Sequence, residues 1–314
     1  MITYYWFILL FLFFLLIPVR QLAQEPRIRF EVLIQNDGDE FLISDIHLDL
    51  NGSIYLLDAL RRRILELRDG QTSPRPIADK AFRERRTGEL IALTRGPLGR
   101  FYIIARMGKE IFAVSQQGSI EQERKVPFRP QGIAFQNRDE LLVLGEHDGK
   151  MFHVFDPDGQ RKRSFGEMFE RLDRVKEYEI GPFEWYVEGD TIYVASPFRY
   201  EIQKHVKERF EKSIVVADTI VRQPEVRTHR DGSVTITMPH TITGIASAGS
   251  YLFVSLCSVS KVSSQYYLDV LDVHKGQIVS RIPLDQFLMV RKADTSGKVF
   301  LVGNNIIQTL TIRE

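Results

Sequence analysis

The sequence contains very little cysteine: Cys257 is the only one among 314 residues. An internal disulfide is therefore impossible, and no cysteine follows the apolar N-terminal segment to carry a lipid anchor. The sequence also lacks an excess of either charge, because 42 basic residues are balanced by 41 acidic ones and the formal net charge is +1. Without a strongly basic surface, the chain is not expected to bind nucleic acid.

Strong catalytic motifs are absent as well. There is no His-Glu-x-x-His zinc motif, no Cys-x-x-Cys pair and no Gly-x-x-x-x-Gly-Lys phosphate loop. Residues 244–249 only approach a nucleophile elbow, because Ile245 stands where that motif requires glycine. Residues 156–159 hold two carboxylates at a calcium-like spacing but lack the remaining ligands, and they fit a hairpin turn. The motifs therefore identify no catalytic residue, no metal ligand and no required cofactor.

One long hydrophobic run is present, at the N-terminus. Residues 4–19 are sixteen consecutive residues without charge. The run is short for a membrane helix, which needs about 20 residues, and it is typical of a secretory signal. We therefore expect residues 1–23 to be a signal peptide or, alternatively, a retained N-terminal anchor, with membrane contact only if the segment is retained. An exported protein without disulfides favours a bacterial envelope protein, periplasmic or extracellular.

The clearest positive signal is a short apolar strand that recurs six times. The recurrences start at intervals of 47, 40, 51, 60 and 47 residues and lie at 54–57, 101–104, 141–144, 192–195, 252–255 and 299–302. Each has an apolar run about eight residues upstream and, about ten residues downstream, a strand of alternating pattern followed by a turn. A strand unit that repeats every 40 to 50 residues or so is typical of a propeller blade.

We therefore predict that residues 24–314 form one all-β domain, a six-bladed β-propeller with four-stranded antiparallel blades. The last unit lacks an outermost strand, because the chain stops soon after residues 306–312. Residues 27–34 are a strand-like segment that the first unit does not need. We expect this N-terminal strand to pair with 306–312 and close the last blade, which would protect an open sheet edge.

The first unit resembles a known repeat. Residues 49–58 read Asp-Leu-Asn-Gly-Ser-Ile-Tyr-Leu-Leu-Asp, and Arg63-Ile64 and the turn Arg68-Asp69-Gly70 follow. This pattern resembles an NHL repeat, and the resemblance implies a wide propeller superfamily rather than one activity. The later units keep the same order of strands and turns but differ at the positions that correspond to Asp58 and Arg63. The third unit, for example, has Gly145 and Lys150 there. In the first unit, Asp58 and Arg63 should form a charge-assisted hydrogen bond between neighbouring strands.

Two insertions interrupt the regular units. Within residues 160–181, the segment 167–176 has apolar residues at helical spacing and could pack on one rim or act as a lid over the central opening. Within residues 222–242, the segment 227–238 predicts an extra hairpin around Arg230-Asp231-Gly232.

Propellers place their binding sites where the innermost strands begin, around the central channel. Projecting the six units onto a ring brings together Asp45, Arg95, Gln131, Glu184, Trp185, Thr243 and Arg291. The set is polar, mixed in charge and includes a flat aromatic surface, which suits a protein partner or a small polar, sugar-like ligand. The sequence therefore predicts a monomeric binding or interaction module with no catalytic residue and no cofactor.

An enzyme is the alternative. The superfamily includes lactonase-like propellers that hold calcium in the channel with Glu, Asn, Asn and Asp, and the ring above does not reproduce that set. His47 and His240 lie near expected inner strands and could join Asp45 or Glu184 around a divalent metal. A metal-dependent hydrolase or lyase that uses the same channel face is thus the competing hypothesis.

Overall fold

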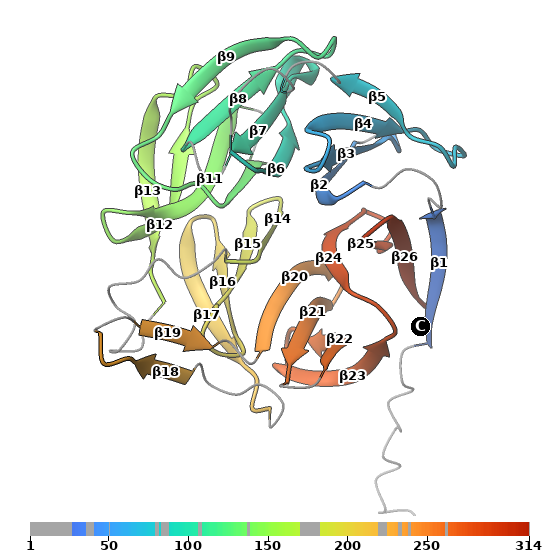
Figure 1. The fold of residues 1–314 in the computed structure, drawn as a ribbon, viewed down its shortest axis with the longest axis vertical. Helices are drawn as coiled ribbons and strands as arrows, with labels where there is room; N and C mark the ends of the chain where they lie inside the picture. The colour runs from blue at the N-terminus through green and yellow to red at the C-terminus, as the bar shows by residue number, and fades with distance from the viewer. Residues whose placement is uncertain are drawn as a thin grey trace, which may run out of the picture.

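The protein is nearly all β-strand and forms a ring of six four-stranded antiparallel sheets around a central channel (Figure 1). The computed structural model describes residues 27–35, 41–49, 51–78, 82, 88–105, 109–136, 139–169, 183–218, 225–231, 234–237, 240–260 and 263–313. The predicted six-bladed propeller is confirmed. The expected signal peptide or anchor, residues 1–23, lies outside the described residues.

Blades 1 to 3 follow one another along the chain, and the first strand of each lies innermost in the ring (Figure 1). Blade 1 comprises β2 (Ile43–Leu48), β3 (Ile54–Asp58), β4 (Arg63–Leu67) and β5 (Arg75–Ala78). Blade 2 comprises β6 (Leu90–Arg95), the short 3-10 helix η1 (Pro97–Gly99), β7 (Phe101–Ala105), β8 (Glu110–Val114) and β9 (Ile120–Lys125). Blade 3 comprises β10 (Gly132–Gln136), β11 (Glu140–His147), β12 (Lys150–Phe155) and β13 (Arg161–Glu167).

Blades 4 and 5 keep this plan, and blade 6 departs from it. Blade 4 comprises β14 (Trp185–Glu188), β15 (Thr191–Ala195), β16 (Glu201–Val206) and β17 (Arg209–Val215). Blade 5 comprises β20 (His240–Ala248), β21 (Tyr251–Val259), β22 (Ser264–Asp272) and β23 (Gln277–Leu284). Blade 6 comprises β24 (Leu288–Ala293), β25 (Val299–Gly303), β26 (Ile306–Arg313) and, outermost, β1 (Arg27–Gln35).

The recurring apolar strand of the sequence is the second strand of each blade. These strands are buried on both faces, as β3 and β25 are along their whole length, because neighbouring blades pack against each side. Burial on both faces explains why they form continuous apolar runs instead of alternating with polar residues. Five apolar clusters fill the spaces between the blades and fix the blades around the channel.

The N-terminal strand closes the ring as predicted. β1 pairs antiparallel with β26 from Arg27 opposite Arg313 to Gln35 opposite Ile306. The last blade therefore combines the two ends of the described chain, and the pairing satisfies the backbone groups of β26 that would otherwise form an open edge. Cys257 lies in β21 and is partly buried.

The predicted ion pair in blade 1 is also confirmed. Arg63 donates from Nε to Oδ2 of Asp58 over 2.9 Å, and the Asp58 side chain is fully buried. Oδ1 of Asp58 accepts the backbone N–H groups of Leu42 and Arg61 at 3.3 Å and 3.2 Å. Three donors on one buried carboxylate tie the β3–β4 hairpin to the segment that enters β2.

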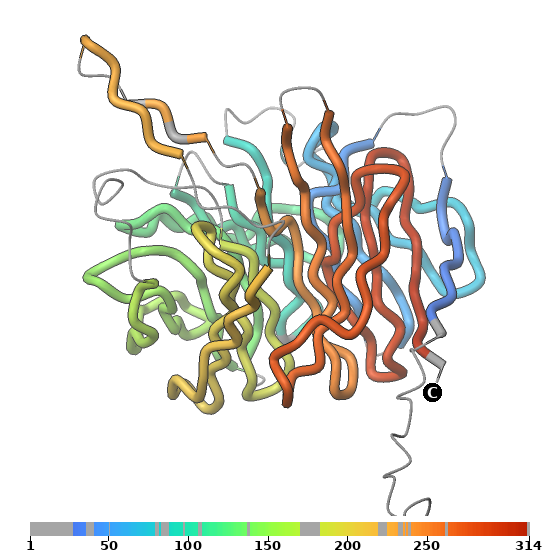
Figure 2. The backbone as a smooth tube through the Cα atoms, turned by 90° about the horizontal axis from the view of Figure 1, so that it is seen from below, coloured from blue at the N-terminus to red at the C-terminus, as the bar shows by residue number. Residues whose placement is uncertain are grey.

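The extra hairpin is present in the second insertion. β18 (Glu225–Thr228) and β19 (Val234–Thr237) form a two-stranded sheet that projects beyond the propeller (Figure 2, orange, upper left). The predicted helix at 167–176, with its lid and rim interpretations, lies mostly outside the described residues. Among the described residues, we find no helix with the length and hydrophobicity needed to cross a membrane.

Candidate functional site

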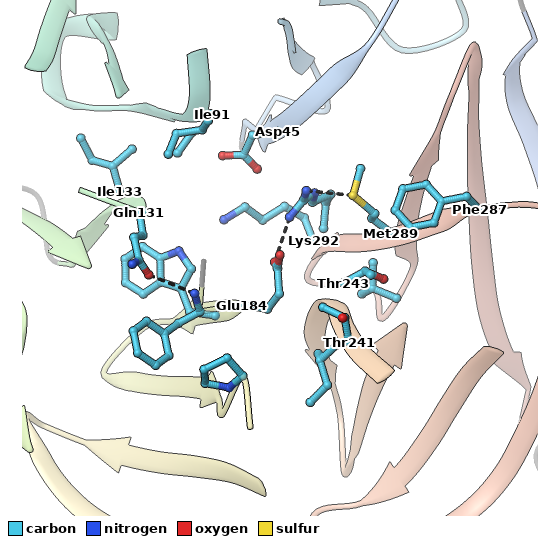
Figure 3. Close-up of a pocket in the computed structure, with 18 residues that line it drawn as sticks. Asp45, Ile91, Gln131, Ile133, Glu184, Thr241, Thr243, Phe287, Met289 and Lys292 are labelled. Carbon is cyan, nitrogen blue, oxygen red and sulfur yellow. Dashed lines mark hydrogen bonds and ion pairs between the residues drawn. The ribbon is translucent and has the colours of Figure 1, made fainter. Parts of the chain in front are cut away.

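A pocket of about 380 Å³ lies where the innermost strands of the blades begin (Figure 3). Every blade contributes to its wall. The charged and amide side chains are Asp45, Gln131, Glu184, Arg291 and Lys292; the others include Ile91, Ile133, Phe183, Trp185, Thr241, Thr243, Phe287 and Met289. The pocket is thus concave and mixed in character, as small-molecule sites usually are.

β-Bulges direct side chains into this pocket. Four of the innermost strands, β2, β6, β20 and β24, carry a register shift within their first four residues. The extra residues are Ser44, Ile91, Thr243 and Arg291, and the last three line the pocket. A bulge places two consecutive residues opposite one partner, so it changes the direction of a side chain that regular alternation would fix.

Asp45 is held rigidly at the wall of the pocket. Its Oδ1 accepts the backbone N–H of Ile46 at 2.9 Å, and its Oδ2 accepts that of Leu93 in the neighbouring blade at 2.8 Å. Burial raises the pKa of Asp45, although the nearby charges of Lys292 and Arg291 act in the opposite direction. The carboxylate therefore joins blades 1 and 2 and adds negative potential to the pocket.

Lys292 extends across the pocket from β24, between Asp45 and Glu184 in the view of Figure 3. No hydrogen bond or ion pair joins the side chain of Lys292 to another residue that the structure describes, and Asp45 attracts its ammonium only through space. Burial lowers the pKa of Lys292, and the positive charge of Arg291 lowers it further. An ammonium group without a direct partner inside a pocket is available to a ligand.

Arg291, the residue before Lys292, is instead paired. Its Nη1 donates to Oε2 of Glu184 over 3.0 Å, and both side chains are largely buried, with exposures of 18% and 16%. Its Nη2 lies 3.0 Å from the sulfur of Met289. The pair connects blade 6 with blade 4 across the pocket, so it serves as a brace as well as a polar surface.

Gln131 and Trp185 complete the wall between blades 3 and 4. Oε1 of Gln131 accepts the backbone N–H of Phe183 at 2.9 Å. Trp185 is partly buried and lies so close to Gly132 that a Cβ at that position would be 2.1 Å from its Nε1. Glycine at position 132 therefore allows the indole to lie against β10 while part of the ring faces the pocket.

Arg95 corrects the sequence-based ring. Six of the seven residues of the predicted ring line the pocket, but Arg95 does not. It is the last residue of β6, whereas the pocket lies at the start of that strand. There it contacts the carboxylate of Asp49 and lies over the Tyr55 ring at 4.9 Å from the ring centroid. Arg95 thus holds blades 1 and 2 together at the other end of the channel.

A divalent metal fits the described residues poorly. No three His, Cys, Asp or Glu side chains among them lie close enough together to hold an ion. Burial lowers the pKa of His47 to about 3, while His240 is engaged with the hydroxyl of Ser258 at 2.8 Å. The carboxylates of Asp45 and Glu184 are each bonded within the protein. The expectation that no cofactor is needed stays a prediction.

The sequence missed several residues of the pocket. Lys292 is the most important of them, because no described residue makes a hydrogen bond or ion pair with its ammonium group. Thr241, Phe287 and Met289 were missed as well. The adjacent Arg291 and Lys292 could have been a signal. Regular alternation would have turned one of them away from the channel, and only the bulge brings both to the pocket.

Several solved structures resemble the fold of this chain. A gluconolactonase from Xanthomonas campestris is 13% identical, with a TM-score of 0.59 over 93% of this chain and 96% of that one. A member of the DUF4221 family from Bacteroides vulgatus is 7% identical, with a TM-score of 0.59 over 92% and 99%. Virginiamycin B lyase from Staphylococcus aureus is 12% identical, with a TM-score of 0.53 over 92% and 100%.

At such identities the likeness shows the fold alone. No protein-family model matches the chain, and no curated protein sequence matches it. The resemblance to NHL repeats is therefore not confirmed beyond the shared propeller architecture.

Proposed function

We propose that this protein is a binding module that holds a small polar ligand in the pocket at the mouth of its channel. The observation that carries the proposal is the convergence of all six blades on one cavity whose wall includes the ammonium of Lys292. Residues far apart in sequence form a rigid, concave surface there. Such preorganisation lowers the entropic cost of binding a ligand.

The size and wall of the pocket favour a compact ligand with both polar and apolar faces. A volume of about 380 Å³ is near the lower end of the usual range for small-molecule sites. Trp185, Ile91 and Ile133 offer apolar surface, and Thr241 and Thr243 offer hydroxyl groups. A sugar-like molecule, with hydroxyl groups around a compact carbon ring, matches these surfaces.

Reversible binding accounts for the described site better than metal-dependent catalysis. The structural neighbours include a lactonase and a lyase, but they share only the fold with this chain. In the pocket, Asp45 and Glu184 are each engaged by donors of the protein itself. We further propose that the protein is exported, an expectation that rests on the apolar run at residues 4–19, and that it acts as a monomer.

A thermal-shift screen tests the binding proposal. The full chain is heated with a panel of neutral sugars, sugar acids, amino sugars and short peptides. We expect at least one class to raise the melting temperature, and the Trp185→Ala variant to lose that shift. Phe210→Ala is the matched control, because it removes an exposed aromatic ring on the outer strand of blade 4.

Two results would count against binding. Either no compound in the panel stabilises the chain, or Trp185→Ala binds as tightly as the unmodified protein. Turnover of a lactone that depends on added calcium would instead support the hydrolase alternative.

A further inference from the structure

The charged groups of the pocket differ in how well the protein itself satisfies them. Both oxygens of Asp45 accept backbone N–H groups, at 2.9 Å and 2.8 Å. Arg291 and Glu184 bind each other at 3.0 Å. The side chain of Lys292 is the only one of these four that makes no hydrogen bond or ion pair within the described part of the chain. The group that the protein leaves without a hydrogen-bonding partner is therefore a positively charged donor, the ammonium of Lys292. A ligand that complements it carries an anionic acceptor.

We propose that the pocket selects a small ligand with one carboxylate group, which pairs with the ammonium of Lys292. This inference rests on the proposed function, because it names the class of ligand that the same pocket takes. A carboxylate gives the ammonium a charge-assisted hydrogen bond that no described residue supplies. The remainder of the ligand would lie against Trp185, whose indole forms part of the wall.

The neighbouring carboxylates limit the charge of the ligand. Asp45 and Glu184 line the same pocket as Lys292, and they would repel a second negative charge. A dianion such as a phosphate monoester is therefore disfavoured relative to a monocarboxylate. A cation would have to lie beside the charges of Lys292 and Arg291, which disfavours an amino sugar. A sugar acid of the uronate type satisfies both limits.

Four compounds of similar shape test the proposal: D-glucuronate, D-glucose, D-glucosamine and D-glucose 6-phosphate. Their affinities for the full chain are measured by isothermal titration calorimetry at low ionic strength. We expect D-glucuronate to bind at least about tenfold more tightly than D-glucose, as a charge-assisted hydrogen bond in a partly buried site allows. The phosphate and the amino sugar should bind more weakly than D-glucuronate.

Variants separate the charge of Lys292 from its bulk. Lys292→Met keeps an unbranched side chain and should abolish the preference for D-glucuronate over D-glucose, measured as the ratio of the two affinities in the same variant. Lys292→Arg should keep part of the preference, because it keeps the charge. Lys275→Met is the matched control; Lys275 lies in the turn between β22 and β23 and its side chain is 65% exposed.

Equal affinity for D-glucose and D-glucuronate overturns the carboxylate proposal and leaves the binding proposal standing. A preference that persists in Lys292→Met overturns it too, because the anion is then recognised elsewhere. If none of the four compounds binds, the carboxylate proposal fails, and the thermal-shift screen decides separately whether the pocket binds another class of molecule.

Discussion

The two ends of the central channel hold similar charges and use them differently. At the pocket end, the ammonium of Lys292 makes no hydrogen bond or ion pair with any described residue. At the other end, Arg95 contacts the carboxylate of Asp49 and lies 4.9 Å from the centroid of the Tyr55 ring. Asp45 lies in β2 and Asp49 directly follows that strand, so about 13 Å of extended chain separates them.

The comparison shows what distinguishes a structural charge from an available one. Arg95 has a carboxylate, an aromatic face and only 19% exposure, so its bonding capacity is used within the fold. Lys292 is placed in a cavity without a direct partner, and burial lowers its pKa. A fold gains nothing from an unpaired, partly buried ammonium, so its position is better explained by a ligand.

The largest expected effect is on stability at the Arg95 end. Arg95→Ala should lower the free energy of unfolding by about 2 kcal/mol, because it removes a largely buried ion pair and a cation–π contact. Chemical denaturation measures the change. Calorimetry with D-glucuronate should show an unchanged affinity, since Arg95 does not line the pocket. If Arg95→Ala instead lost its affinity for D-glucuronate and kept its stability, the ligand would bind at the Arg95 end of the channel.

The next largest expected effect is on the pH dependence of ligand binding at the pocket end. The pKa of Lys292 is lowered, so the group loses its proton earlier than usual as the pH rises; the pKa of Asp45 is raised, so the group gains a proton earlier as the pH falls. His47, with a pKa of about 3, stays neutral, and Arg291 and Glu184 complete the charges around Lys292.

Both shifts make the pocket more positive at lower pH. Affinity for D-glucuronate should therefore rise by about tenfold between about pH 9 and about pH 5.5, where the sugar acid is still ionised. Calorimetry across this range provides the profile. In Lys292→Met only the smaller contribution of Asp45 should remain, and a profile that this variant does not change would contradict the assignment.

A smaller effect is expected from Asp45→Asn. The change removes a negative charge near Lys292, so the affinity for D-glucuronate should rise about threefold. Stability should fall by about 1 kcal/mol, because one of the two backbone N–H groups loses its acceptor. Calorimetry and denaturation report the two changes separately. A weaker affinity for the anion would mean that Asp45 contacts the ligand as an acceptor.

The smallest expected effect is on stability at the pocket end. Lys292→Met should leave the free energy of unfolding unchanged or raise it by up to about 1 kcal/mol, because the fold loses a partly desolvated charge. This is the opposite of the loss expected for Arg95→Ala, measured by the same denaturation experiment. A clear loss of stability would show that Lys292 serves the fold after all.

Most of the fold could be predicted from the sequence, for a physical reason. The second strand of each blade is buried on both faces, so it forms a continuous apolar run that recurs with every blade. The pairing of β1 with β26 followed from a missing strand at one end and a spare strand at the other.

The site was harder to predict, because its residues depend on where each inner strand begins and whether it is bulged. Arg95 was assigned to the pocket although it lies at the far end of β6. Lys292 was missed because only the bulge at Arg291 brings both of these consecutive side chains to the pocket. Neither the exact start of a short strand nor a one-residue bulge leaves a reliable pattern in the sequence.

A crystal structure of the full chain with D-glucuronate tests the central claim most directly. The account predicts that the carboxylate lies about 3 Å from Nζ of Lys292, with the sugar ring against Trp185 and no ligand at Arg95. A sugar acid bound at Arg95, or bound in the pocket with its carboxylate directed away from Lys292, would contradict the account.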